Sequence, residues 1–168
     1  MNQSLLSWAE IDLDIAAANV RALKQIVDKD VIFVAVVKAN AYGHGAVEIA
    51  AVALQHGAEW IIVNRSSEGV ELRRANITAP IFVLGHTLPQ EADRMVRWDL
   101  RPTLTSLVQA EAYSRAAEKY GKEVRIHLKI DTGMGRLGVF PAQAVEFARA
   151  VSKPVSYTHL TLPTTPYV

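Results

Sequence analysis

The chain has 168 residues, a formal net charge of +1 and no cysteine. This charge balance gives no attraction for nucleic acid or for an anionic membrane, and without cysteine there is neither a disulfide nor a cysteine-based metal site. Hydrophobic residues make up 50% of the chain, as in soluble globular proteins, and its longest apolar run, residues 31–37, is too short to span a bilayer.

Strands and helices are predicted to alternate from the N-terminus onwards. The first 15 residues lack the basic segment and apolar core of a signal peptide, so we expect a soluble, cytoplasmic protein. Residues 8–13 alternate loosely and suggest a short strand, after which Asp14 is placed to cap a helix with Val20, Leu23 and Val27 on one face. Further strands are predicted at residues 31–37, 59–63, 79–84, 101–105 and 123–130, and further helices at 46–55, 68–75, 89–96, 106–120 and 141–151.

This alternation is typical of right-handed βαβ units around a parallel sheet. A (β/α)8 barrel and an open doubly wound sheet both fit the pattern. The open sheet normally carries a GxGxxG turn after its first strand, whereas this chain has ANAYGHG there. A barrel takes about 250 residues, so the five clean units seen here predict a partial one.

Lys38 is the first candidate for chemistry. It follows a β-branched apolar run that we expect to be a strand buried on both faces, and Asn40, Gly43 and Gly45 then provide a permissive turn. A lysine at the mouth of such a strand loses hydration, which favours its neutral, nucleophilic form. Tyr42 adds a hydrogen-bonding group, and the alternative interpretation is a lysine that merely reaches solvent at a strand end.

A second cluster, KIDTGMGRLG, spans residues 129–138 at the end of the fifth strand. Alternation is expected to place His127, Lys129 and Asp131 on one face and residues 126, 128 and 130 on the other. Arg136 lies in a glycine-rich loop above the strand end, where its guanidinium suits a carboxylate. His127 has no partner at metal-ligand spacing and is interpreted as structural, and no HExxH, Walker A or paired-carboxylate motif is present.

Three segments resemble the bacterial alanine racemases. AVVKANAYGHG (residues 35–45) is similar to the pyridoxal-phosphate attachment signature of that family, and WAEIDLDIAAANVRAL (8–23) and HLKIDTGMGRLGV (127–139) to its N-terminal and mid-barrel signatures. The resemblance implies a (β/α)8 barrel with a β-rich C-terminal domain, acting as a homodimer that interconverts L- and D-alanine for peptidoglycan.

The resemblance also assigns roles to particular residues. Lys38 would hold pyridoxal 5'-phosphate as an internal aldimine and exchange the α-proton on one face. Tyr42 would contact the cofactor phosphate, Leu84 would help wall the ring, and Arg136 would contact the phenolic oxygen and the substrate carboxylate. Lys129 matches a lysine that some members carry as a carbamate, and no metal is implied. The opposite-face tyrosine of the family comes from a partner subunit's C-terminal domain.

The family pattern ends near Pro154. Residues 155–168, VSYTHLTLPTTPYV, resemble a translated sequencing adapter rather than the expected sixth strand. We therefore expect residues 1–154 to be the N-terminal part of the barrel and the remainder to be a foreign tail. A barrel cut after five strands exposes unpaired edges, so the chain alone is expected to be unstable and inactive. A non-catalytic pyridoxal-phosphate barrel protein and a racemase for another small amino acid such as serine remain alternatives.

Overall fold

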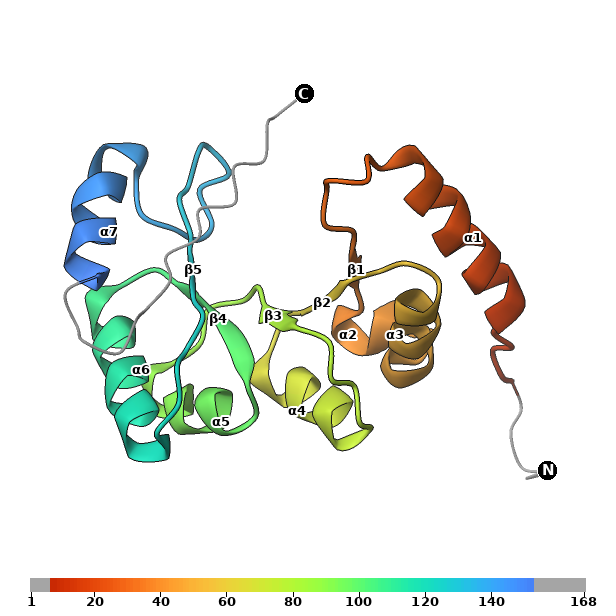
Figure 1. Cartoon of the computed structure of the whole chain (residues 1–168), viewed down its shortest axis with the longest axis horizontal. Coiled ribbons are helices and arrows are strands. Elements are labelled where there is room, and N and C mark those ends of the chain that lie inside the picture. Colours follow the sequence, from red (N-terminus) through yellow and green to blue (C-terminus); the bar gives the residue numbers. More distant parts are fainter. Residues whose placement is uncertain (1–6, 153–168) are drawn as a thin grey trace.

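The computed structural model describes residues 7–152, in which strands alternate with helical segments from residue 34 onwards, as predicted (Figure 1). The strands are β1 (Val34–Val36), β2 (Trp60–Val63), β3 (Ile81–Val83), β4 (Leu100–Leu104) and β5 (His127–Leu128). The helices are α1 (Leu13–Ile26), α2 (Lys38–Tyr42), α3 (Ala46–Gln55), α4 (Ser66–Arg74), α5 (Ala92–Arg97), α6 (Leu107–Tyr120) and α7 (Ala144–Val151). Short 3-10 turns, η1 (Pro89–Glu91) and η2 (Pro141–Gln143), precede α5 and α7.

All five strands are parallel and lie in the order β1-β2-β3-β4-β5, each hydrogen-bonded to the strand that follows it in sequence. In a doubly wound sheet the order would reverse at a switch point. Sequential order, with α3 to α6 along one side of the sheet (Figure 1), is instead the arrangement of a barrel wall. The predicted partial barrel is therefore confirmed.

The two faces of this sheet differ in burial. The helix-covered face is the more buried one, with Ile61, Ile81, Val83 and Leu104 all at 0% exposure. Most residues of the inner face of the wall are only partly buried; they are Trp60, Ile62, Phe82, Arg101 and His127. Thr103, which pairs with His127, is the buried residue of this face. The strand pairings place these side chains in adjacent rows, since Ile62 pairs with Phe82 and Phe82 with Arg101.

The prediction that the first strand is buried on both faces is wrong. β1 covers only residues 34–36 and pairs with β2 at the edge of the described sheet. Val31, Ile32 and Val36 are therefore 52%, 50% and 41% exposed, while Val37, on the helix side, is 1% exposed. The apolar run therefore has one face buried under the helices and one inner face that is partly exposed in the described part of the chain.

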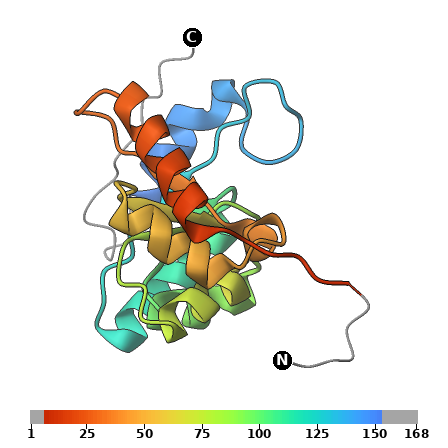
Figure 2. The same ribbon diagram turned by 90° about the vertical axis from the view of Figure 1, so that its right-hand side faces the viewer.

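The N-terminal segment also differs from expectation. Residues 8–12 form no strand, and α1 begins at Leu13. The cap is Asp12, whose Oδ1 accepts hydrogen bonds from the backbone N–H groups of Asp14 (2.9 Å) and Ile15 (3.0 Å). Asp14 instead lies in the first turn, where its charge favours the helix dipole. Figure 2 shows α1 crossing over α3, against which it packs.

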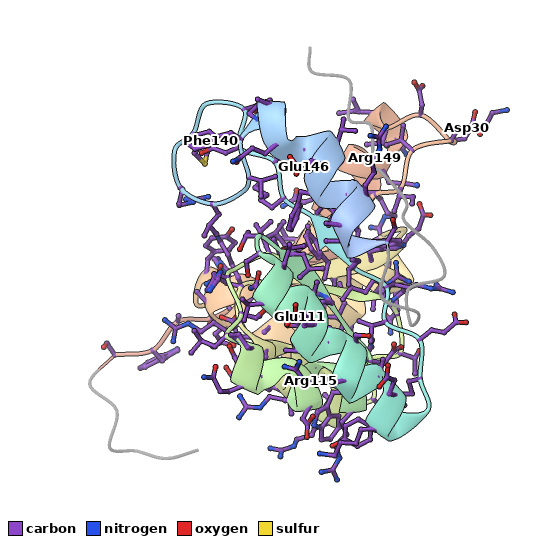
Figure 3. The ribbon with its side chains drawn as sticks, turned by 90° about the vertical axis from the view of Figure 1, so that its left-hand side faces the viewer. Asp30, Glu111, Arg115, Phe140, Glu146 and Arg149 are labelled. Atoms are coloured by element: carbon purple, nitrogen blue, oxygen red, sulfur yellow. The ribbon has the colours of Figure 1, made fainter. Side chains whose placement is uncertain are left out.

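The remaining elements follow the predicted pattern with shorter strands. α3 has the predicted bounds, whereas β5 is limited to two residues of the predicted 123–130. α6 begins after Ser106, whose Oγ accepts from the Gln109 N–H at 3.3 Å, and ends at Gly121, whose φ is 58°. Figure 3 shows Glu111 and Arg115 on the outer side of α6, with α7 above it. Within residues 7–152, no helix has both the length and the apolar character needed to cross a membrane.

Candidate functional site

The residues predicted to carry chemistry follow the carboxyl ends of three strands. Lys38 comes two residues after β1, Leu84 directly follows β3 and Lys129 directly follows β5. Because parallel strands end at the same edge of the sheet, all three lie on the rim where barrel enzymes place their sites.

The backbone after Lys38 forms a left-handed turn. Ala39, Asn40, Ala41 and Tyr42 have φ values of 51°, 55°, 51° and 56°. None of them is glycine, and each non-glycine residue in this region costs about 1–2 kcal/mol. Such strain persists only where surrounding contacts fix it, and it is commonly found at functional sites.

Several hydrogen bonds hold this turn. The Asn40 side chain accepts from the Ala46 N–H at 2.8 Å, and the Asn40 carbonyl accepts from the N–H groups of Gly43 and Gly45, both at 3.0 Å. The N–H of Ala39 donates to Glu68 Oε1 on α4 at 2.8 Å. The turn is therefore fixed both internally and from the neighbouring βα unit.

Lys38 and Tyr42 stand at the two ends of this turn. The Lys38 Nζ lies 5.9 Å from the centroid of the Tyr42 ring, within the range of a cation–π contact. Lys38 is partly buried, whereas Tyr42 is 61% exposed. Val37, which directly precedes the lysine, and Ala41, one turn after it, are both buried.

A pocket of about 280 Å³ brings together three of the five predicted site residues, Leu84, Lys129 and Arg136. Its other lining residues are Ile130, Asp131, Thr132, Met134 and Leu137, and neither Lys38 nor Tyr42 lines it. Leu84 is fixed there because its N–H donates to the Val63 carbonyl at 2.9 Å and its carbonyl accepts from Thr103 Oγ1 at 3.2 Å. The predicted residues thus form two groups, the lysine turn and this pocket.

The loop that carries Arg136 folds back on the end of β5. The N–H of Asp131 donates to the Val139 carbonyl and the N–H of Val139 to the Lys129 carbonyl, both at 2.9 Å. Asp131 Oδ1 accepts from the N–H groups of Gly135 and Gly133, both at 3.0 Å, and these bonds lower the pKa of the Asp131 carboxyl.

Ile130 lines the same pocket as Lys129, beyond the end of the regular strand β5. The strand ends at Leu128, and the bridge from Ile130 to Val139 replaces regular sheet pairing. Regular strand pairing therefore supports the predicted alternation of faces only as far as residue 128, and the faces of residues 129–131 stay a prediction.

His127 lies on the inner face of the sheet, where it packs against two aromatic rings. Its ring centroid is 4.3 Å from that of Phe82 and 5.8 Å from that of Trp60. Burial, reinforced by the charge of Arg101, lowers the pKa of His127 to about 4. These contacts support the interpretation of His127 as structural.

Sequence reasoning missed Glu68 and Thr103 as residues that support the site. Each bonds to a backbone group that precedes it by about twenty residues or more, at Ala39 and Leu84 respectively, and no local pattern displays such a contact. The one available signal was the position of Glu68 at the third residue of a helix, where a carboxylate caps the preceding backbone N–H groups.

The chain matches the family model described as "Alanine racemase, N-terminal domain" over residues 11–162. The match extends into residues 155–168, the predicted foreign tail, which lies outside the described residues. The chain is 45% identical to the alanine racemase of Symbiobacterium thermophilum over 147 residues, which are 88% of this chain and 39% of that protein. It is 50% identical to that of Desulfosudis oleivorans over 133 residues, or 79% and 34%.

Solved structures give the same result. The alanine racemase of Clostridium difficile 630 in complex with cycloserine superposes with a TM-score of 0.87 at 34% identity, covering 92% of this chain and 43% of that one. The alanine racemase of Bacillus anthracis with bound L-Ala-P gives a TM-score of 0.84 at 32% identity, covering 92% and 40%.

The chain spans between about a third and two fifths of the length of these curated relatives. Its fold, its strand order and its sequence all point to one family. The chain belongs to the alanine racemase N-terminal domain family.

Proposed function

We propose that this chain is the cofactor-binding part of an alanine racemase and that Lys38 is the residue that attaches pyridoxal 5'-phosphate. The alanine racemase family as a whole depends on this cofactor. The observation that carries the proposal is Lys38 itself, a partly buried amine that follows the first parallel strand and begins a strained, left-handed turn.

The groups at this rim fit an anionic aldehyde. Lys38 supplies a primary amine for covalent attachment, and Tyr42 supplies a phenol that would bind the phosphate. Arg136 and Lys129 add two cations in one pocket, with Leu84 as an apolar wall for the ring. Arg136 would bind the phenolic oxygen of the cofactor and the carboxylate of the amino acid, since guanidinium matches carboxylate geometry.

When bound, the cofactor would delocalise negative charge from the α-carbon of the amino acid and so make its α-proton acidic. The Lys38 amine would take up or return that proton on one face. Racemisation also needs an acid or base on the opposite face, a role that we assign to a partner subunit in a homodimer.

Lys129 and Arg136 line the same pocket as two like charges. Carbamylation of Lys129 would turn its side chain into an anion, which would then pair with Arg136 and orient the guanidinium. We therefore propose Lys129 as a candidate for that modification.

Alanine is the proposed substrate, because the C. difficile relative binds cycloserine and the B. anthracis relative binds L-Ala-P. The product would supply D-alanine for peptidoglycan in the cytoplasm. The alternatives of a cofactor carrier or a serine racemase have no specific observation in their favour.

Reductive trapping tests the assignment of Lys38. The 168-residue chain is incubated with pyridoxal phosphate, reduced with borohydride, digested and mapped by mass spectrometry. We expect the label on Lys38 in preference to Lys24 and Lys119, which are engaged in surface ion pairs with Glu59 and Asp93. Lys38→Arg should remove the label and Lys129→Arg should keep it. Equal labelling of all lysines, unchanged in Lys38→Arg, would rule out the assignment.

A further inference from the structure

The turn that carries Lys38 is connected to the next βα unit through one side chain, Glu68. This residue lies in the first turn of α4, and its carboxylate accepts three backbone hydrogen bonds. Oε1 accepts from the Ala39 N–H at 2.8 Å, and Oε2 accepts from the N–H groups of Asn64 (2.7 Å) and Arg65 (2.8 Å). Both carboxylate oxygens are therefore used, on two different loops.

The position of the Ala39 N–H makes this contact significant. Ala39 directly follows Lys38 and is the first residue of the left-handed turn. The hydrogen bonds of Asn40 stay local, because its carbonyl binds N–H groups within the turn and its side chain binds the N–H of Ala46 at the start of α3. Glu68 instead connects the turn to the loop after β2, because its other oxygen accepts from Asn64 and Arg65 in that loop. The backbone just before the turn is also bonded to β2, since the Val37 N–H donates to the Ile62 carbonyl at 2.9 Å.

The helix that carries this carboxylate, α4, is packed tightly against the sheet. Its residues Val70 and Leu72 are buried, and Gly69 lies so close to the sheet that an added Cβ would be 2.9 Å from Leu100 and 3.5 Å from Ile81. Hydrogen bonds to a carboxylate are about twice as strong as those between neutral groups. Glu68 therefore joins a strained turn to a well-packed element.

We propose that Glu68 is a positioning residue that holds the left-handed turn and so sets the placement of the Lys38 amine toward the cofactor. The role of Lys38 in this statement rests on the proposed function. That Glu68 restrains the turn is independent of the proposed function, because it follows from the three hydrogen bonds alone.

The chemistry of glutamate is specific for this task. A glutamine at position 68 has a single acceptor oxygen and would turn an NH2 group toward a backbone N–H, so it could serve only one of the two loops. An aspartate is one methylene shorter and would not span both. Glu71, an exposed residue one turn later on α4, provides a matched control on the same helix.

The test compares the 168-residue chain with Glu68→Gln, Glu68→Ala and Glu71→Gln by hydrogen exchange without cofactor and by borohydride trapping with pyridoxal phosphate. In both Glu68 variants we expect amides of residues 39–45 to exchange roughly tenfold faster and Lys38 to be labelled roughly tenfold more slowly. Amides of α6, labelling of Lys119 and the Glu71→Gln variant should match the wild type.

A merely structural role would instead speed exchange in α6 as well and lower the melting temperature of the whole domain. If Glu68→Ala does not fold, the nearly isosteric Glu68→Gln carries the comparison. Unchanged exchange at residues 39–45 in Glu68→Gln overturns the proposal. Faster exchange there, with no Lys38 label in the wild type, would support the hold on the turn and reject the proposed function.

Discussion

Single residues at the end of β5 fix the loop that presents Arg136. Gly138 has φ 126°, and a Cβ added there would lie 2.6 Å from the Asp131 nitrogen and 3.0 Å from the Lys129 carbonyl oxygen. These are backbone atoms, which cannot move aside as a flexible side chain can. The close approach of two backbone segments, together with the Asx-type bonds of Asp131, therefore requires glycine at position 138.

Gly138→Ala should destabilise the domain by about 2–3 kcal/mol, because it combines a steric clash with an unfavourable φ. Gly135→Ala is the matched control. Its φ of 69° is also positive, but an added Cβ meets nothing within 4 Å, so we expect a loss of only about 1 kcal/mol. Urea unfolding measures both, and equal losses in the two variants would argue against the tight backbone contact.

His127 should make folding sensitive to acid. Its pKa is about 4 in the folded state and 6.5 when unperturbed, so between these values the unfolded chain binds a proton that the folded chain does not. The contribution of His127 to the free energy of unfolding is therefore fully present above pH 6.5 and is lost as the pH drops toward 4. Since His127 is only partly buried, we expect a loss on the order of 2 kcal/mol.

Urea unfolding between pH 7 and pH 4 measures this contribution. The His127→Gln variant should lose less stability over the same interval, since it has no group to titrate there. Parallel curves for the two proteins would show that His127 does not contribute.

At the scale of elements, periodicity and capping chemistry predicted the order of the five strands and the bounds of α3, but also a strand at residues 8–13 that the structure lacks. They overextended the strands, because apolar residues lie both before the first and after the last ladder pair of β1 and β5. The left-handed turn was not predictable, since Ala39, Ala41 and Tyr42 carry no local signal for positive φ. Its support comes from Glu68, which is distant in sequence.

The start of α1 gives a direct test of capping. Asp12→Ala should cost about 1 kcal/mol, because Oδ1 of Asp12 accepts the first two free N–H groups of the helix. Asp14→Ala should cost about half as much, since it removes only a favourable charge near the helix dipole. Thermal unfolding followed by circular dichroism compares the two, and the reverse order would place the cap at Asp14.

At the scale of the whole molecule, the described residues form five consecutive units of a barrel wall. The helix side is closed and well packed, while Trp60, Ile62 and Phe82 line an inner face that is only partly buried. Motifs along the sequence drew attention to the ends of particular strands, and the structure places Leu84, Lys129 and Arg136 in one pocket. The sequence could not predict that Lys38 and Tyr42 would stand apart from it, since that depends on loop geometry.

The most direct test of the account is a hybrid enzyme. Residues 11–152 of this chain replace the matching segment of the Symbiobacterium thermophilum alanine racemase, to which the chain is 45% identical. The hybrid, loaded with pyridoxal phosphate, is assayed for interconversion of L- and D-alanine, with L-serine as a second substrate. We predict alanine racemisation that falls by about a hundredfold or more in Lys38→Ala. A folded hybrid without activity, or one whose activity survives Lys38→Ala, would contradict the account.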